Sequence, residues 1–328
     1  MQSSSDSAGI RFVQNYLGFV VMGVFFLLAL VFLLSSDSPG DIFSPDYLFE
    51  FLNGFLMMGI IAIGTVAATR IKGPDLSVPT VMALAGVMIA ADPSIVGISL
   101  AVLLCLFFGL INGTVISLLN APSAVVTFIT SLLIAGVAYN IAISSSDYGW
   151  VRFERMDVAP EILSVIALVV SAGVAFGALA VTKRLMNQKD ERKQGVLPKL
   201  MDVLGYGLVA IIAVIAGFAL INWNGGASSW DGYQYQVYVI IVFAAVKSSR
   251  LLKSSMVALA YGFAAALVLS VYWHAVYIAR FIIDLSYWNE VIFAAIALLL
   301  FCTACAAQGG WRSMLTPNLS ECTETNPE

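Results

Sequence analysis

The sequence has 328 residues, of which 60% are hydrophobic and only 11% are charged. Water-soluble domains carry about 25% charged residues, so this composition excludes an ordinary soluble fold. The net charge is −4, and no group of basic residues in the sequence indicates nucleic-acid binding. Most of the apolar surface is therefore expected to face lipid.

Apolar runs close to the length that crosses a bilayer, about 20 residues, recur along the chain. Such runs must be helices, because lipid offers no partner for free backbone N–H and C=O groups. The 237–246 run is short, so it is either half a span or continues into polar surroundings. The sequence predicts an all-α, polytopic transmembrane helical bundle of about ten spans. The runs are 17–34, 51–69, 76–91, 95–118, 124–143, 161–181, 201–221, 237–246, 255–273 and 288–307.

The lysine and arginine distribution predicts the orientation. With the N-terminus in the cytoplasm, the basic residues on the opposite side are Arg152, Arg155 and Arg280, and the other thirteen of the sixteen are cytoplasmic. This bias is the positive-inside pattern. It predicts a cytoplasmic N-terminal tail, a membrane domain and a cytoplasmic C-terminal tail. These three parts are 1–16, 17–307 and 308–328.

Two predicted helices meet at Arg70–Val78 with almost no loop between them. Pro74 cannot continue the first helix, and Gly73 relaxes the backbone. Asp75 is suited to capping the N–H groups of the next helix. The alternative is that Asp75 and Ser77 line a polar path through the membrane, and the sequence leaves both roles open.

The Gly109–Gly113 segment lies inside an apolar run. Its small residues let helices approach closely, and the Asn112 amide can form hydrogen bonds between helices. Packing and contact with a polar solute are both open roles for Asn112. Asn53, Thr127 and Asn140 are similar polar residues in apolar runs.

Several of these motifs resemble one family of transporters. Gly73-Pro74-Asp75-Leu76-Ser77-Val78 resembles the Gly-Gly-Ile-Asp-Leu-Ser-Val-Gly signature of sugar-type ABC importer permeases. This group includes ribose, galactose and xylose permeases, with relatives that move nucleosides or autoinducer-2. The 109–113 and 122–127 segments resemble the family's next landmarks at similar spacing. The chain departs from the family at Lys72, Pro74 and Pro79 and at the 247–250 turn, which suggests one member of an unequal pair of permeases.

The resemblance implies the permease subunit of an ABC importer in a bacterial inner membrane, translocating a sugar-like or related small polar solute. The implied partners are an ABC ATPase subunit, which uses the ATP, a second permease subunit and an extracytoplasmic solute-binding protein. The second permease is either an identical chain or a different one, and the departures from the family favour a different one. The implied substrate pathway is Asn53, Asp75, Ser77, Asn112, Thr127 and Asn140. The implied ATPase docking loop, within 182–200, carries Lys189, Arg192, Lys193, Gly195 and Lys199. That loop has a simpler interpretation, as a solvated basic connection that only fixes the topology.

The sequence lacks the motifs of several classes of protein. The chain has no Gly-Lys dipeptide and thus no P-loop, and its single histidine is His274. We therefore predict no catalytic residue, no metal site and no cofactor held by this chain. A stand-alone secondary transporter and an intramembrane enzyme are the alternatives. The absence of an acidic residue at the middle of a predicted span counts against the first, and the absence of a nucleophile or metal cluster against the second.

The orientation is testable with single cysteines and an impermeant thiol reagent in intact cells. Cysteines placed in 182–200 should be protected, because the basic bias places that loop in the cytoplasm, and cysteines in 144–158 should react. The reverse labelling pattern would rule out the predicted orientation and the docking loop with it.

Overall fold

The computed structural model describes most of the central part of the chain. The described residues are 44–146, 148–154, 156, 158–187, 196–248, 255–279, most of 16–34 and a few positions within 295–302. Among them, the continuous elements are α2 (Pro45–Ile71), α3 (Val78–Ala91), α4 (Ile95–Leu118), α5 (Ser123–Ser145), β1 (Trp150–Arg152), α6 (Pro160–Asn187), α7 (Val196–Asn224), β2 (Gly226–Ser228), α8 (Trp230–Ser248) and α9 (Ser255–Ala279).

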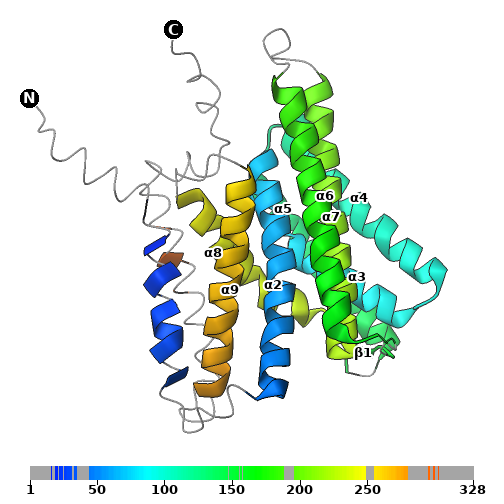
Figure 1. The fold of residues 1–328 in the computed structure, drawn as a ribbon. Coiled ribbons are helices and arrows are strands. Elements are labelled where there is room, and N and C mark those ends of the chain that lie inside the picture. Colours follow the sequence, from blue (N-terminus) through cyan, green and yellow to red (C-terminus); the bar gives the residue numbers. More distant parts are fainter. Residues whose placement is uncertain are drawn as a thin grey trace, which may run out of the picture.

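These helices form a bundle that confirms the predicted membrane class (Figure 1). In the described residues, α2, α4, α5, α6, α7 and α9 are long and apolar enough to cross a membrane, and α3 is a shorter apolar helix. The chain is thus a multi-pass membrane protein. The expected 237–246 run belongs to the longer α8, whose first half is polar. Most positions of the expected 17–34 run are described, and they are helical, including the apolar segment Met22–Val31. The expected 288–307 run and both tails lie largely or wholly outside the described residues.

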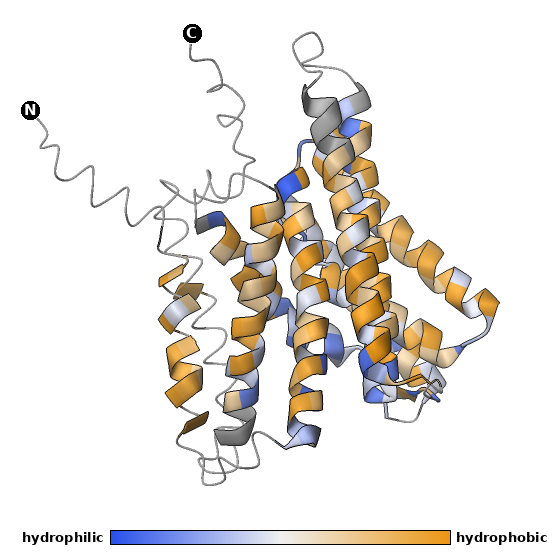
Figure 2. Ribbon diagram, in the orientation of Figure 1, coloured by the Kyte–Doolittle hydropathy of each residue, from blue (hydrophilic) through white to orange (hydrophobic). Residues whose placement is uncertain are grey.

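The outer helices carry their large apolar side chains on the outside. On α4, Leu100, Leu103 and Phe107 are exposed, whereas the small Ala101 and Cys105 are fully buried. Water would disfavour this arrangement, but lipid does not, and small inward residues let helices pack closely. The helices are accordingly apolar over most of their length (Figure 2). Cys105 behaves as a small core residue with a free thiol.

Helices α2 and α7 are mostly buried and form the centre of the bundle. The most extensive contact between two helices joins α4 to α7. A Cβ added at Gly113 would lie 2.7 Å from the Cα atom of Val203, and one at Gly109 would lie 2.6 Å from the Cβ atom of Ala210. This close packing confirms the role predicted for the small residues of the 109–113 segment.

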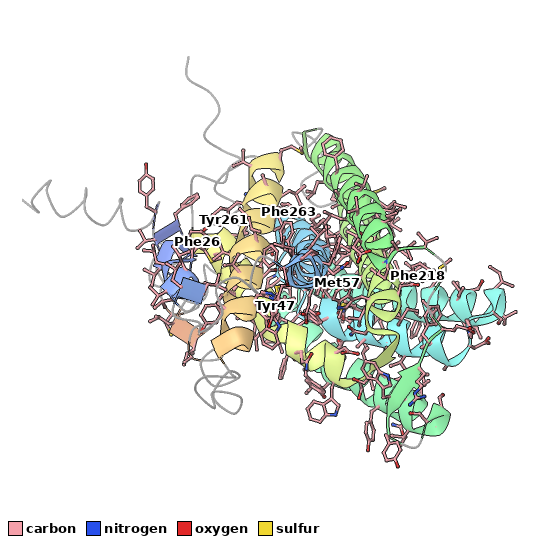
Figure 3. The ribbon with its side chains drawn as sticks, turned by 60° about the horizontal axis from the view of Figure 1, so that its bottom comes forward. Phe26, Tyr47, Met57, Phe218, Tyr261 and Phe263 are labelled. Atoms are coloured by element: carbon pink, nitrogen blue, oxygen red, sulfur yellow. The ribbon has the colours of Figure 1, made fainter. Side chains whose placement is uncertain are left out.

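Helix α9 packs on the opposite side of α2 through aromatic rings. The ring centroids of Phe55 and Phe263 are 4.7 Å apart, and a Cβ at Gly59 would lie 2.8 Å from the Phe263 ring. Phe263 accordingly lies beside α2, whereas Phe218 of α7 lies on the far side of the bundle (Figure 3).

A short β-ribbon interrupts the all-helical pattern that the sequence predicts. Strand β1 pairs antiparallel with β2, with Val151 opposite Ala227. Both side chains are buried against the C-terminal half of α3, where a Cβ at Gly86 would lie 3.1 Å from the Cβ atom of Ala227. The ribbon lies at the lower right of the bundle in Figure 1, at the lower ends of α6 and α7.

The connection between α6 and α7 is shorter than the sequence predicts. The expected 182–200 loop is helical up to Asn187 and again from Val196. The intervening residues 188–195 are outside the described part of the chain, and four docking residues predicted there, Lys189, Arg192, Lys193 and Gly195, are among them. Lys199 belongs to the first turns of α7.

The α4–α7 contact predicts opposite effects for two glycine substitutions. Gly113→Ala should lower the melting temperature of the purified protein in detergent, because overpacking costs about 1–3 kcal/mol. Gly136→Ala, on α5, is the matched control. Nothing lies within 4 Å of a Cβ at Gly136, so this variant should keep or raise the melting temperature through better helix propensity. Equal melting temperatures would contradict the close packing.

Candidate functional site

The connection between α2 and α3 places six residues, 72–77, inside the bundle. The N–H groups of Lys72 and Gly73 both donate to the carbonyl of Ala68, at 3.2 Å each, and end α2. Pro74 then prevents the helix from continuing. The break that the sequence predicts is confirmed, and it leaves backbone groups of the connection in need of other partners.

A chain of hydrogen bonds joins Asp75 to α4. The Ser77 hydroxyl donates to Asp75 Oδ1 at 2.6 Å, and the Ser77 N–H donates to the same oxygen at 2.9 Å. Asn112 Nδ2 donates to Ser77 Oγ at 2.9 Å. All three residues are at most 3% exposed. Ser77 is the N-cap residue of α3, and Asp75 accepts from its N–H group and its hydroxyl.

Helix α5 binds the same connection through Thr127. The Leu76 N–H donates to Thr127 Oγ1 at 3.0 Å, and this hydroxyl donates to the Ser123 carbonyl at 2.8 Å. Thr127 is fully buried. A backbone N–H that the helices leave unpaired is therefore satisfied by a side chain 51 residues away in sequence.

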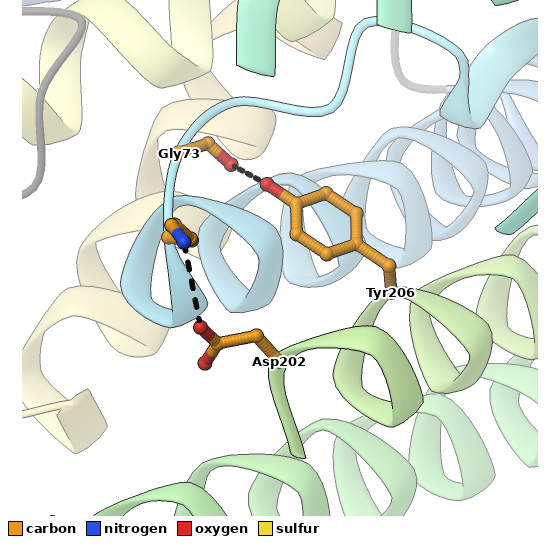
Figure 4. A network of polar contacts seen from close by, with 4 residues as sticks. Gly73, Asp202 and Tyr206 are labelled. Carbon is orange, nitrogen blue, oxygen red and sulfur yellow. Dashed lines mark hydrogen bonds and ion pairs between the residues drawn. The ribbon is translucent and has the colours of Figure 1, made fainter. Parts of the chain in front are cut away.

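Helix α7 binds the connection at two points (Figure 4). The Tyr206 hydroxyl donates to the Gly73 carbonyl at 3.0 Å, and Tyr206 is fully buried. One helical turn earlier, Asp202 Oδ2 lies 3.9 Å from Lys72 Nζ. Burial lowers the pKa of Lys72, Asp202 raises it and nearby Lys199 lowers it further. We call Asp75, Ser77, Asn112, Thr127 and Tyr206 the turn cluster.

The carboxyl group of Asp75 is the charged element of the turn cluster. It is 3% exposed and forms no ion pair with any described residue. Burial raises the pKa of Asp75, while the hydrogen bonds from the Ser77 hydroxyl and N–H lower it. The net direction is upward, so the fold favours the protonated form.

One acceptor of the turn cluster has no partner among the described residues, Asn112 Oδ1. The Ser77 hydroxyl donates to Asp75 and can only accept from Asn112, which fixes the amide with its nitrogen toward Ser77. The fully buried oxygen thus remains available to a donor such as a solute hydroxyl or a water molecule.

A polar stripe extends from the turn cluster along α5. Ser123, Thr127 and Ser131 are spaced four residues apart, share one helix face and are at most 3% exposed. Gln236 Nε2 of α8 donates to Ser131 Oγ at 3.0 Å. The stripe thus leads from the α2–α3 connection toward the polar first half of α8.

Two predicted pathway residues lie outside the turn cluster. Asn53, eighteen residues before the end of α2, is about 27 Å from that end along the helix axis. Its Nδ2 donates to the Phe49 carbonyl and to Glu161 Oε1 of α6. Asn140 is exposed, and its Nδ2 donates to Gly136 of its own helix. Asp75, Ser77, Asn112 and Thr127 are brought together.

Tyr206 is the turn-cluster residue that the sequence analysis missed. Its flanking residues, Gly205 and Gly207, were the available signal, because glycines inside an apolar helix indicate a close approach to another element. A Cβ at Gly205 would lie 2.7 Å from Ile71 Cδ1, at the end of α2. The partner itself is 133 residues away in sequence.

Within the described residues, no three His, Cys, Asp or Glu side chains gather into a possible metal site. Comparison with known proteins adds no assignment: the chain matches no protein-family model, no curated protein and no solved structure.

Substitutions of Asp75 test how the connection is held. Asp75→Asn should keep or raise the melting temperature, because the amide oxygen can accept both bonds from Ser77 without a buried charge. Asp75→Ala should lower stability by about 1–3 kcal/mol, because it leaves buried donors of Ser77 without an acceptor. Similar melting temperatures for the Ala and Asn variants would contradict this role.

The same pair of proteins gives a pH test. Because the folded pKa of Asp75 is raised, the folded state holds the proton more tightly than the unfolded chain. The stability of the wild type should therefore fall as the pH rises from the ordinary carboxyl pKa near 3.8 through the folded value. Melting temperatures measured from pH 4 to 8 should show this loss in the wild type relative to Asp75→Asn.

Proposed function

We propose that this chain is the membrane-spanning permease subunit of an ABC importer, with a sugar-like or related small polar solute as its cargo. The observation that carries the proposal is the turn cluster. It holds a carboxyl group, two hydroxyl side chains, an amide and a phenol in the interior of a lipid-facing bundle. Polar groups at such positions are expensive, and in membrane proteins they mark solute and ion pathways.

The location of the turn cluster supports the resemblance to sugar-type ABC importer permeases. The 73–78 segment, which carries the resemblance to sugar-type permeases, is the part of the chain that is buried and bonded to α4, α5 and α7. The 109–113 and 122–127 segments, which resemble the next family landmarks, supply Asn112 and Thr127. Three sequence motifs thus meet at one place in the fold.

The polar stripe supports transport of a neutral polar solute. Hydroxyl and amide groups from Ser131 and Gln236 continue the polar surface beyond the turn cluster. Asn112 Oδ1, which has no hydrogen-bond partner among the described residues, is an acceptor that suits a solute hydroxyl. Sugars present many hydroxyls and need such neutral donors and acceptors rather than ionic partners.

The rest of the assembly follows from the proposal. The chain contributes about ten spans, with both termini in the cytoplasm, to a bacterial inner membrane. ATP is bound and hydrolysed by separate ATPase subunits, since this chain has no P-loop. A second, different permease subunit completes the channel, and an extracytoplasmic solute-binding protein delivers the cargo. Nucleosides and autoinducer-type solutes are the alternative cargo.

Asp75 favours a second candidate function, a stand-alone proton-coupled transporter. The sequence places this residue at a span end, but the structure buries it without an ionic partner among the described residues. A buried carboxyl group with a raised pKa can bind and release a proton near the solute path. The two candidates differ in their energy source.

Reconstitution separates the two candidates. The purified chain alone in liposomes should hydrolyse no ATP and should not concentrate labelled ribose, galactose or xylose. Together with its ATPase, second permease and binding protein, it should take up one of these sugars or a nucleoside only when ATP is supplied.

Accumulation by the chain alone under an imposed proton gradient would reject the importer. Loss of that accumulation in Asp75→Asn, with unchanged expression, would then support the proton-coupled transporter.

A further inference from the structure

Helix α7 fixes the α2–α3 connection through two residues one helical turn apart. Tyr206 bonds the carbonyl of Gly73, and Asp202 lies beside the ammonium group of Lys72 (Figure 4). The two contacts differ in how deeply they are buried. The Lys72 and Asp202 side chains are 22% and 20% exposed, so their ion pair is partly solvated, whereas Tyr206 is fully buried.

The Gly73 carbonyl depends on Tyr206 for a hydrogen-bond donor. It lies just past the end of α2, where the last carbonyl groups of a helix have no partner within the helix. Gly73 is buried, and Pro74 follows it. Removing the phenol hydroxyl would leave this carbonyl without that donor in an apolar interior, which is more costly than losing a solvated contact.

Tyr206 itself has little freedom to move. A Cβ at Gly207 would lie 3.0 Å from Leu110 Cδ2, and one at Gly113 would lie 3.1 Å from the Cβ atom of Tyr206. Helix α4 therefore packs directly against the α7 segment that carries the tyrosine. A shift of α7 must move the phenol hydroxyl, and with it the carbonyl that the hydroxyl holds.

We propose that Tyr206 is a positioning residue for transport: its bond to Gly73 couples α7 to the α2–α3 connection and so sets the positions of Asp75 and Ser77. The inference rests on the proposed function, because it assumes that solute passes beside the turn cluster. It adds that α7 controls the pathway through one neutral hydrogen bond.

A cysteine reporter at Leu76 tests the coupling without any solute or partner protein. Leu76 is half-buried and lies between Asp75 and Ser77 in the connection, so a thiol there reports local opening. Cys302, Cys305 and Cys322 are replaced by serine, and the fully buried Cys105 is retained. The protein without the reporter gives the background rate of labelling by a maleimide.

Tyr206→Phe keeps the ring and removes only the hydroxyl. In the full-length protein carrying the reporter, we expect labelling to accelerate about threefold or more. The net loss of one buried hydrogen bond shifts an opening equilibrium by about this factor. Asp202→Asn, which weakens the partly solvated contact, should give a smaller increase and serves as the second variant if Tyr206→Phe does not fold.

Tyr261→Phe is the matched control. The Tyr261 hydroxyl is buried and has no partner among the described residues. Tyr261 belongs to α9, which supplies no residue of the turn cluster, and its ring lies 4.6 Å from that of Phe19. Figure 3 shows Tyr261 at the left of the bundle. This variant should label at the wild-type rate. An unchanged rate in Tyr206→Phe, or equal acceleration in both variants, would overturn the proposal.

Transport by the reconstituted assembly gives the second readout. Tyr206→Phe should reduce uptake of the transported sugar at least about threefold at normal expression, whereas Tyr261→Phe should not. Accelerated labelling with unchanged uptake would show that the bond holds the connection but does not position the pathway. Because labelling needs no cargo, its outcome is independent of whether the importer itself is correct.

Discussion

A break between two helices inside a lipid-facing bundle must find all its hydrogen-bond partners within the protein. Lipid offers none, and each unpaired polar group costs free energy. The 72–77 connection meets this constraint through three neighbouring helices. Thr127 of α5 accepts from Leu76, Asn112 of α4 donates to Ser77, and Tyr206 of α7 donates to Gly73. The arrangement of the bundle around α3 depends on these contacts.

The close packing of α4 and α7 is a condition for that network. Asn112 and Tyr206 bond to the same connection from different helices, so the two helix backbones must lie close together. Gly109 and Gly113 on α4 and Gly207 on α7 leave room for this approach. The glycines and the buried polar side chains thus form one structural unit, in which small residues bring the polar ones within reach of the connection.

Local signals made part of this unit predictable. Pro74 marks the helix break and Gly109–Gly113 the close packing, because each effect arises within a few residues of its cause. The partnership of Tyr206 with Gly73 and the pairing of β1 with β2 join segments far apart in sequence, and nothing local specifies them. The six membrane-length helices could be predicted from the length of the apolar runs alone. The apolar runs did not predict the polar first half of α8, nor the helical extension of α6 beyond the predicted span.

The charged residues of the connection differ in whether the fold gives them an ionic partner. Lys72 is only three residues from Asp75, yet its ammonium group lies beside Asp202, and Asp75 remains without an ionic partner among the described residues. An asparagine could accept both bonds from Ser77 without the cost of a buried carboxylate. Stability alone therefore gives no reason for an acid at this position. Under the proposed function, this cost is explained by an interaction that needs the charge or the proton of Asp75, with solute, with a coupling ion or with a second conformation of the turn cluster.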